Sequence, residues 1–264
     1  MLPHLYYRQA YGKIHRMNEL VLVLPLVFLA GFIDSIAGGG GLISLPAYLI
    51  AGIPIHQAMG TNKLSSSFGS LSASITFFLH RKLWLKLAFY ASFFAFTGAY
   101  LGTRLALLVP ANTLKTLLIL VLPFMALFIL RKRPETTFTQ EEKTPWIKIA
   151  WISFLVGMYD GFIGPGTGTL LIFGFVGVVK MAYTQASANA KVVNLASGLA
   201  SLVAFSLSGN VNVSLGILAA GASILGNVTG SHLAIKMGKR IIQPMLVLVL
   251  GLLLLKLVWD QLGL

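Results

Sequence analysis

Apolar segments separated by glycine, proline or charged residues divide the chain from residue 20 to residue 258. The longer segments approach or exceed the roughly 20 residues that one helical membrane crossing needs, whereas two of them are too short to span. This pattern predicts an all-α polytopic membrane protein with about seven or eight transmembrane helices. The segments cover residues 20–37, 42–51, 58–79, 87–109, 114–130, 149–163, 170–179, 186–207, 213–235 and 241–258.

The pattern of the first half of the chain recurs in the second half. A shift of 126 residues superposes Gly31, Asp34, Gly38 and Gly40 on Gly157, Asp160, Gly164 and Gly166. A shift of 128 residues superposes Lys63, Gly98 and Gly102 on Lys191, Gly226 and Gly230. We interpret the matches as two homologous membrane repeats, residues 20–130 and 149–264, joined by a soluble linker at 131–148 and preceded by a basic tail at 1–19.

Composition agrees with a membrane protein and excludes a soluble domain. Hydrophobic residues make up 56% of the chain and charged residues only 10%, against about 25% charged in soluble proteins. The net charge of +13 comes from basic residues in short loops, where they set membrane topology and contact anionic lipid. We therefore expect a multi-pass protein of the cell membrane that contacts lipid and binds no nucleic acid, and oligomeric state stays open.

The chain has no cysteine, and its histidines do not cluster in the sequence. Because acidic residues at metal-ligand spacing are missing as well, we predict no metal site and no cofactor.

A glycine-rich run interrupts the first apolar segment of each predicted repeat. In secondary transporters such interrupted helices form the substrate site at the repeat interface, where exposed backbone amides and helix N-termini suit an anion. Close helix packing is the structural alternative. We interpret the runs as broken or re-entrant helices that bind substrate. The predicted residues are Gly38, Gly39, Gly40 and Gly41 in the first repeat and Gly164, Gly166, Thr167 and Gly168 in the second.

Asp34 and Asp160 precede the two glycine runs inside apolar segments. A charge at the bilayer centre costs about 2.5 to 3.5 kcal/mol, so each carboxylate should be paired, protonated or exposed to a cavity. Two roles remain open from the sequence. The carboxylates could couple transport to protons or cations, or they could support the helix breaks by accepting hydrogen bonds from freed amides.

Lys63 and Lys191 occupy equivalent positions near the start of equivalent apolar segments. Snorkelling of each lysine to the lipid headgroups is the structural alternative. Because the lysine is duplicated together with polar neighbours, we favour one shared anion site. When that site is empty, Lys63 could pair with Asp34, and their repeat mates Lys191 and Asp160 could pair likewise. The polar neighbours assigned to this site are Asn62, Ser66, Asn189 and Asn194.

These motifs resemble one known family. Residues 31–46, GFIDSIAGGGGLISLP, and 58–63, AMGTNK, are similar to the sulfite exporter TauE/SafE family, as are 159–168, YDGFIGPGTG, and 188–191, ANAK. The resemblance extends over nearly the whole chain after residue 19. It implies a duplicated membrane protein that moves sulfite, sulfonates or other small organic anions, often as an exporter. The Asn62-Lys63 pair resembles one poorly characterised branch of the family.

We therefore predict an anion transporter that exports sulfite, organosulfonates or related anions, and no enzymatic activity. A passive anion channel is the main alternative. An intramembrane aspartyl protease would need Asp34 and Asp160 to share one proton, but the Gly-x-Gly-Asp motif of such enzymes is missing.

The distribution of basic residues gives conflicting evidence on whether the two halves are parallel or inverted in the membrane. Loop 81–86 carries three basic residues and its counterpart 208–212 carries none, while Lys236, Lys239 and Arg240 mark the next loop. This switch favours inverted repeats, whereas the basic tail at 1–19 and the long segment 20–37 favour parallel ones. We slightly favour inverted halves.

Overall fold

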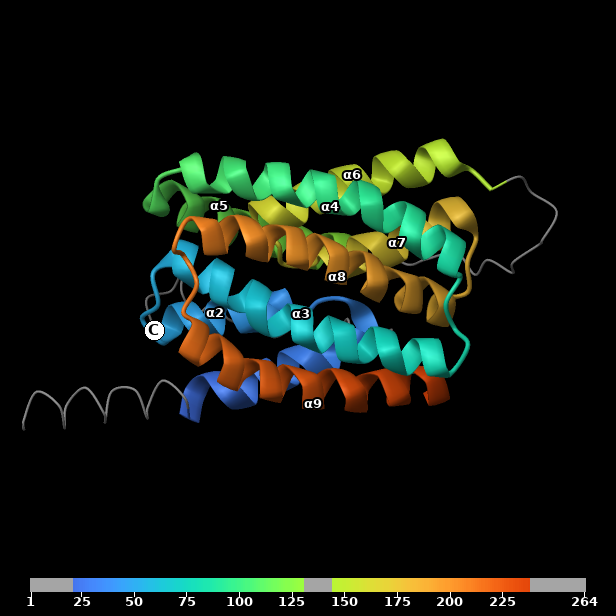
Figure 1. Ribbon diagram of the computed structural model, residues 1–264, viewed down its shortest axis with the longest axis horizontal. Coiled ribbons are helices and arrows are strands. Elements are labelled where there is room, and N and C mark those ends of the chain that lie inside the picture. The colour runs from blue at the N-terminus through green and yellow to red at the C-terminus, as the bar shows by residue number, and fades with distance from the viewer. Residues whose placement is uncertain (1–20, 131–143, 238–264) are drawn as a thin grey trace, which may run out of the picture.

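The computed structural model describes residues 21–130 and 144–237. All regular structure in these two stretches is helical (Figure 1). The predicted basic tail, most of the linker and the last apolar segment, 241–258, lie outside the described residues. The helices are a first helix, Val21–Ala37, then α2 (Gly41–Ile50), α3 (Ile55–Leu79), α4 (Leu85–Leu108), α5 (Ala111–Leu130), α6 (Trp146–Phe162), α7 (Thr167–Val179), α8 (Tyr183–Leu207) and α9 (Val213–Met237).

The prediction of an all-helical chain is confirmed for these residues. Each described helix coincides with one predicted apolar segment, and the ends differ by at most three residues. By length and apolar character, three described helices are able to cross a membrane: α4, α8 and α9. The 25 residues of α3 are as long as α8, but they include a serine-rich run and Lys63.

Contacts at the loops show how the long helices run. The Thr61 hydroxyl accepts a hydrogen bond from the Asn212 amide at 2.9 Å, so the start of α3 lies beside the start of α9. The Asn189 side-chain oxygen accepts one from the Trp84 amide at 3.1 Å, so the start of α8 lies beside the start of α4. Because α8 ends where α9 begins, α3 and α8 run in opposite directions, as Figure 1 shows.

The fourth helix of each half, α4 or α9, packs against a helix of the other half. Glycines on α9 lie against the backbone of the first helix, and glycines on α4 lie against the backbone of α6. A Cβ added at any of these glycines would overlap a carbonyl oxygen of the neighbouring helix. The contacts are Gly226 to Phe28, Gly230 to Phe32, Gly98 to Phe154 and Gly102 to Met158, and equivalent residues differ by the offsets found in the sequence.

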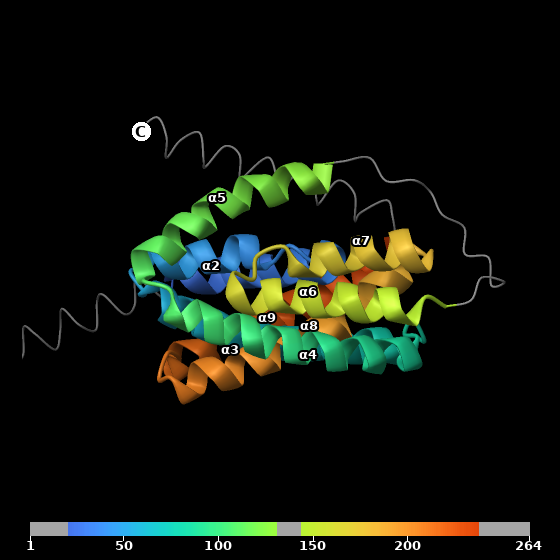
Figure 2. The ribbon, with the colours of Figure 1, turned by 90° about the horizontal axis from the view of Figure 1, so that it is seen from above.

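The first helix and α6 both stop inside the helical bundle, and the chain turns back there. The first turn is at Gly38, whose φ of +80° favours glycine, and the second contains Gly164 and Gly166 with φ of +95° and +88°. The short helices α2 and α7 then lead back toward the starts of α3 and α8 (Figure 2). The two turns therefore lie inside the bundle, at the ends of four helices.

Candidate functional site

Two buried ion pairs connect the halves at the level of the turns. The Lys63 ammonium lies 2.8 Å from Asp160 Oδ2 and also donates to the Asp160 carbonyl oxygen at 2.8 Å. The Lys191 ammonium pairs in the same way with Asp34 Oδ2. Each lysine therefore neutralises the carboxylate of the other half, whereas the sequence suggested Lys63 with Asp34 and Lys191 with Asp160. Such pairs need their remaining hydrogen bonds satisfied, because desolvation of two charges is costly.

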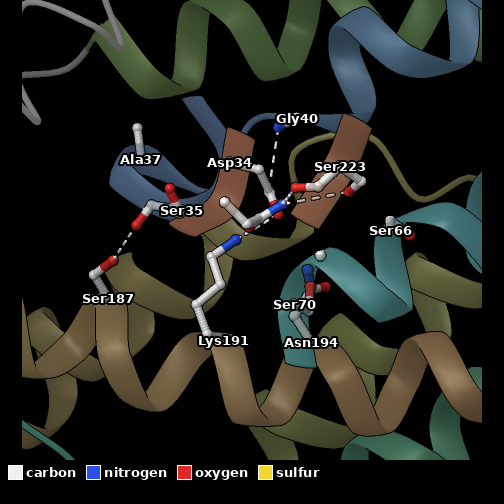
Figure 3. A network of polar contacts seen from close by, with 12 residues as sticks. Asp34, Ser35, Ala37, Gly40, Ser66, Ser70, Ser187, Lys191, Asn194 and Ser223 are labelled. Atoms are coloured by element: carbon white, nitrogen blue, oxygen red, sulfur yellow. Dashed lines mark hydrogen bonds and ion pairs between the residues drawn. The ribbon is translucent and has the colours of Figure 1, made fainter. Parts of the chain in front are cut away.

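Asp34 also makes a contact with the turn that follows it. The Gly40 amide donates to Asp34 Oδ1 at 3.2 Å, and the Gly38 amide donates to the Asp34 carbonyl oxygen at 2.8 Å. Figure 3 shows Lys191 reaching from α8 toward the same carboxylate. A carboxylate in this position holds the turn in shape and neutralises the ammonium at the same time.

Asp160 is surrounded by more hydrogen-bond donors than Asp34. Thr167 Oγ1 donates to its Oδ1 and Ser197 Oγ donates to its Oδ2, both at 2.8 Å. The Tyr159 hydroxyl donates to the Pro165 carbonyl oxygen at 2.5 Å and braces the same turn from the other side. Each oxygen of the Asp160 carboxylate thus has a hydroxyl contact even without counting the lysine.

The two turns touch each other. The Thr169 amide donates to the Gly38 carbonyl oxygen at 3.1 Å, and its hydroxyl donates to the Ala37 carbonyl oxygen at 2.8 Å. A Cβ added at Gly38 would overlap the backbone of Gly168. Part of the exposed backbone at the helix breaks is therefore paired across the halves, which leaves less of it for a ligand than the sequence suggested.

A cavity lies beside this contact, with about 50 Å³ open to water-sized molecules. Since one water needs about 10–15 Å³ of such volume, the cavity has room for a few waters or one small anion. Most of the residues assigned to the site from the sequence line it. They are Asp34, Gly38, Gly40, Gly41, Asn62, Lys63, Ser66, Asp160, Gly164, Gly166, Thr167, Gly168 and Asn194.

Three residues assigned to the site do not line the cavity. The Gly39 backbone faces Leu42 and Thr169. The Asn189 amide holds Trp84 at the loop between α3 and α4, as Thr61 holds Asn212 at the equivalent loop. Lys191 is 1% exposed and is turned toward Asp34. Asn189 and Lys191 were assigned to the site because their segment is equivalent to the one that contains Lys63. In the fold they contact Trp84 and Asp34 and do not line the cavity.

The sequence interpretation missed four polar residues that line the cavity: Ser44, Ser65, Ser223 and Asn227. A signal for Asn227 was present, since an amide in the middle of the apolar segment 213–235 is costly unless it faces protein or a cavity. The serines gave no comparable signal, because serine is common where membrane helices pack closely.

The arrangement does not support an aspartyl protease. Such an enzyme needs two carboxylates that share a proton, whereas Asp34 and Asp160 each pair with a lysine. Among the described residues, histidine and acidic side chains form no group of three or more able to hold a metal ion. The cavity is lined by two carboxylates, each paired with a lysine, and by the Lys63 ammonium, hydroxyls and amides, which are the groups that can bind an anion.

Comparisons with known proteins agree with the helical pattern. The sequence model described as Sulfite exporter TauE/SafE matches residues 23–257. A probable membrane transporter protein, ORF9, of Sinorhizobium sp is 38% identical over 242 residues, which cover 91% of this chain and 93% of that protein.

Other relatives are of similar length. A probable membrane transporter protein of Haemophilus influenzae is 35% identical over 93% of this chain and 96% of its own. The probable membrane transporter protein YfcA of Escherichia coli is 33% identical over 93% and 95%. No solved structure matches the chain significantly.

Proposed function

The chain belongs to the sulfite exporter TauE/SafE family, and from that premise we propose a multi-pass transporter of the cell membrane that exports small anions. Its relatives bear the name of probable membrane transporters, and neither they nor the family are described as enzymes. Sulfite and small organosulfonates are the proposed substrates. The family's name supports this choice, and so does the size of the cavity.

The observation that carries the proposal is the position of Lys63. Lys63 is 6% exposed and lines the cavity, so its ammonium is the cation that we expect an entering anion to meet. A charge-assisted hydrogen bond to such a group contributes about 1.5 to 3 kcal/mol. We place the anion between Lys63 and the amides and hydroxyls that line the same space.

We further propose that the two halves are inverted repeats with re-entrant hairpins. Opposite directions of α3 and α8 support this, as do the matching contacts of α4 with α6 and of α9 with the first helix. Inverted repeats with broken helices place a transporter's substrate site at the repeat interface near the bilayer midplane. The hairpins then enter from opposite faces of the membrane and meet at Gly38 and Gly168.

Asp160 is the proposed coupling group. In the empty protein it neutralises Lys63, so an anion must compete with it for the same ammonium. Protonation of Asp160 would remove this competition and admit the anion together with a proton. Asp34 has the structural role, because its carboxylate holds Gly40 and the deeply buried Lys191.

The test is sulfite flux in proteoliposomes that contain the full chain. We expect the wild type to accumulate sulfite in response to a proton gradient, and Lys63→Met/Asp160→Asn to lose flux while eluting as a folded protein. Asp160→Asn alone accepts hydrogen bonds but cannot titrate, so it should keep exchange and lose gradient-driven accumulation. Sulfite movement that never exceeds its equilibrium distribution would favour a passive channel, and no sulfite movement would contradict the proposal.

A further inference from the structure

A polar wall contributed by α9 gives the cavity a second kind of contact. Ser223 and Asn227 are 3% and 1% exposed, and both line the cavity that Lys63 lines. The Asn227 side-chain nitrogen donates to the Ser223 carbonyl oxygen at 3.0 Å, which fixes the orientation of the amide. The other end of that amide, Oδ1, has no hydrogen-bond partner within the described part of the chain.

Two neighbouring helices leave room for this wall. A Cβ added at Gly31 in the first helix would lie 2.8 Å from the Asn227 nitrogen. A Cβ added at Gly69 in α3 would overlap both Asn227 and the Ser223 hydroxyl. Any larger residue at Gly69 would push these side chains out of place. The sequence thus combines two small residues on one side with two polar residues on the other (Figure 3 shows Ser223 facing the Asp34 region).

The equivalent place in the other half is built differently. Ser223 and Asn227 correspond to Ala95 and Ala99, which are buried, and Gly69 corresponds to Ser197. Helix packing alone is therefore achieved with alanine at these positions. Helix packing therefore does not require the polar side chains of Ser223 and Asn227, which occur only in the half whose α9 lines the cavity.

A second buried acceptor belongs to another residue that lines the same cavity. The Oδ1 atom of Asn62, the residue before Lys63, is also buried without a hydrogen-bond partner in residues 21–130 and 144–237. A buried polar atom without a partner costs about 1 to 3 kcal/mol. Two such acceptors, on residues that line the cavity together with Lys63, are explained if a ligand supplies a hydrogen-bond donor as well as a negative charge.

We propose that the site selects small monoanions that carry a hydroxyl group, with Lys63 binding the anionic oxygen and the single hydroxyl proton shared between the Oδ1 atoms of Asn62 and Asn227. Hydrogensulfite and glycolate belong to this class. Sulfate and propionate do not. Asn227 is then a specificity-determining residue, and Gly31 and Gly69 position it. The inference rests on the proposed function, because it assigns the substrate class of the same cavity.

The test uses two competitors with the same number of non-hydrogen atoms and the same charge. Glycolate carries a hydroxyl where propionate carries a methyl group. Radiolabelled sulfite is bound to the full chain in detergent, and each competitor is titrated against it. We expect glycolate to displace sulfite at a concentration at least about tenfold lower, because propionate leaves the amide acceptors unpaired.

Variants then locate the preference. Asn227→Leu, which keeps the side-chain size, should reduce the ratio between the two competitors toward one. Thr229→Val is the matched control on the same helix, since Thr229 is exposed and bonds only to the carbonyl oxygens of its own helix. Asn62→Leu should act like Asn227→Leu and serves as the second variant if Asn227→Leu does not fold.

The outcomes separate this inference from the proposed function. Equal competition by glycolate and propionate in the wild type would overturn the hydroxyl selection and leave anion transport in place. An undiminished preference in both leucine variants would overturn the role of the two asparagines. Sulfite binding that is absent in the wild type would instead contradict the anion site itself.

Discussion

The centres formed by Lys63 with Asp160 and by Lys191 with Asp34 contain the same two residue types at equivalent positions, but their surroundings differ. Lys63 and its partner both line the cavity, whereas Lys191 lies behind Asp34 and does not reach it. The same two charged residue types therefore occur twice, and their neighbours determine which ammonium lies at the cavity.

The residues that make the surroundings of the two centres different lie on α3, α8, α4 and α9. Asp160 accepts a hydrogen bond from the Ser197 hydroxyl. The residue equivalent to Ser197 in the first half is Gly69, which has no side chain to donate. The space left at Gly69 is taken by Ser223 and Asn227. In the Lys63–Asp160 centre, the protein's own hydroxyl groups donate to the carboxylate. At the equivalent place near the Lys191–Asp34 centre, Ser223 and Asn227 line the cavity instead.

The largest expected difference between the centres concerns loss of the lysine. Within residues 21–130 and 144–237, Lys191→Met leaves the Asp34 carboxylate with one hydrogen-bond donor, the Gly40 amide, and a buried charge without its partner costs about 3 to 5 kcal/mol. Lys63→Met should cost less, because Thr167 and Ser197 still donate to Asp160. The free energy of unfolding by SDS in mixed micelles measures both.

Lys191→Met/Asp34→Asn is the control for this comparison, since it removes the charge as well as its partner. It should recover most of the stability lost in Lys191→Met. Equal losses for the two single lysine variants would show that the centres do not differ in their protein donors.

The next effect separates the two turns. Gly38→Ala should cost about 2 to 4 kcal/mol, since its Cβ meets the Gly168 backbone and φ is positive. Gly164→Ala shares the positive φ, but its nearest atom is the Asp160 carbonyl oxygen at 3.2 Å, so it should cost less. Gly177→Ala, with open space around its Cβ, is the control. Thermal unfolding in detergent that ranks Gly164→Ala below Gly38→Ala in stability would contradict the contact between the turns.

A smaller effect is expected where only a hydroxyl differs. Ser197→Ala removes one donor from the Asp160 carboxylate and should lower the unfolding free energy by about 1.5 to 3 kcal/mol. Ser206→Ala on the same helix is the control, because position 206 is exposed. A loss no greater than that of the control would show that Asp160 does not depend on this hydroxyl.

The smallest expected effect is one in which the halves behave alike. Thr61→Val and Asn189→Leu each remove the side-chain oxygen that accepts a loop amide, at equivalent places. Each should cost about 0.5 to 1.5 kcal/mol and leave sulfite binding unchanged. If Asn189→Leu abolished sulfite binding without unfolding the protein, Asn189 would belong to the site as the sequence suggested.

Helices were predictable here because apolar length and glycine breaks are local properties of the sequence. The helix starting at Ile55 and the break at Gly38 were both indicated in this way. The sequence suggested Lys63 with Asp34, but Lys63 pairs with Asp160, because the choice of partner depends on how the halves approach each other. Asn189 illustrates the limit, since its position in the sequence suggested a ligand while the fold uses it to hold a loop.

The polar wall was hidden for a related reason. Gly69 and Asn227 are 158 residues apart in the sequence, and only the packing of α3 against α9 shows that the glycine makes room for the amide. Without the fold, Gly69 is one more small residue in a serine-rich helix.

The most direct test is to locate a bound anion by crystallography with selenite, in which selenium replaces the sulfur of sulfite and gives an anomalous signal. We expect one peak in the cavity, within hydrogen-bond reach of Lys63 and beside Asn62 and Asn227. Lys63→Met/Asp160→Asn crystals soaked in the same way should lack it. A selenium peak bonded to Lys191, or one outside the cavity, would contradict the assignment of the anion site to the Lys63 centre.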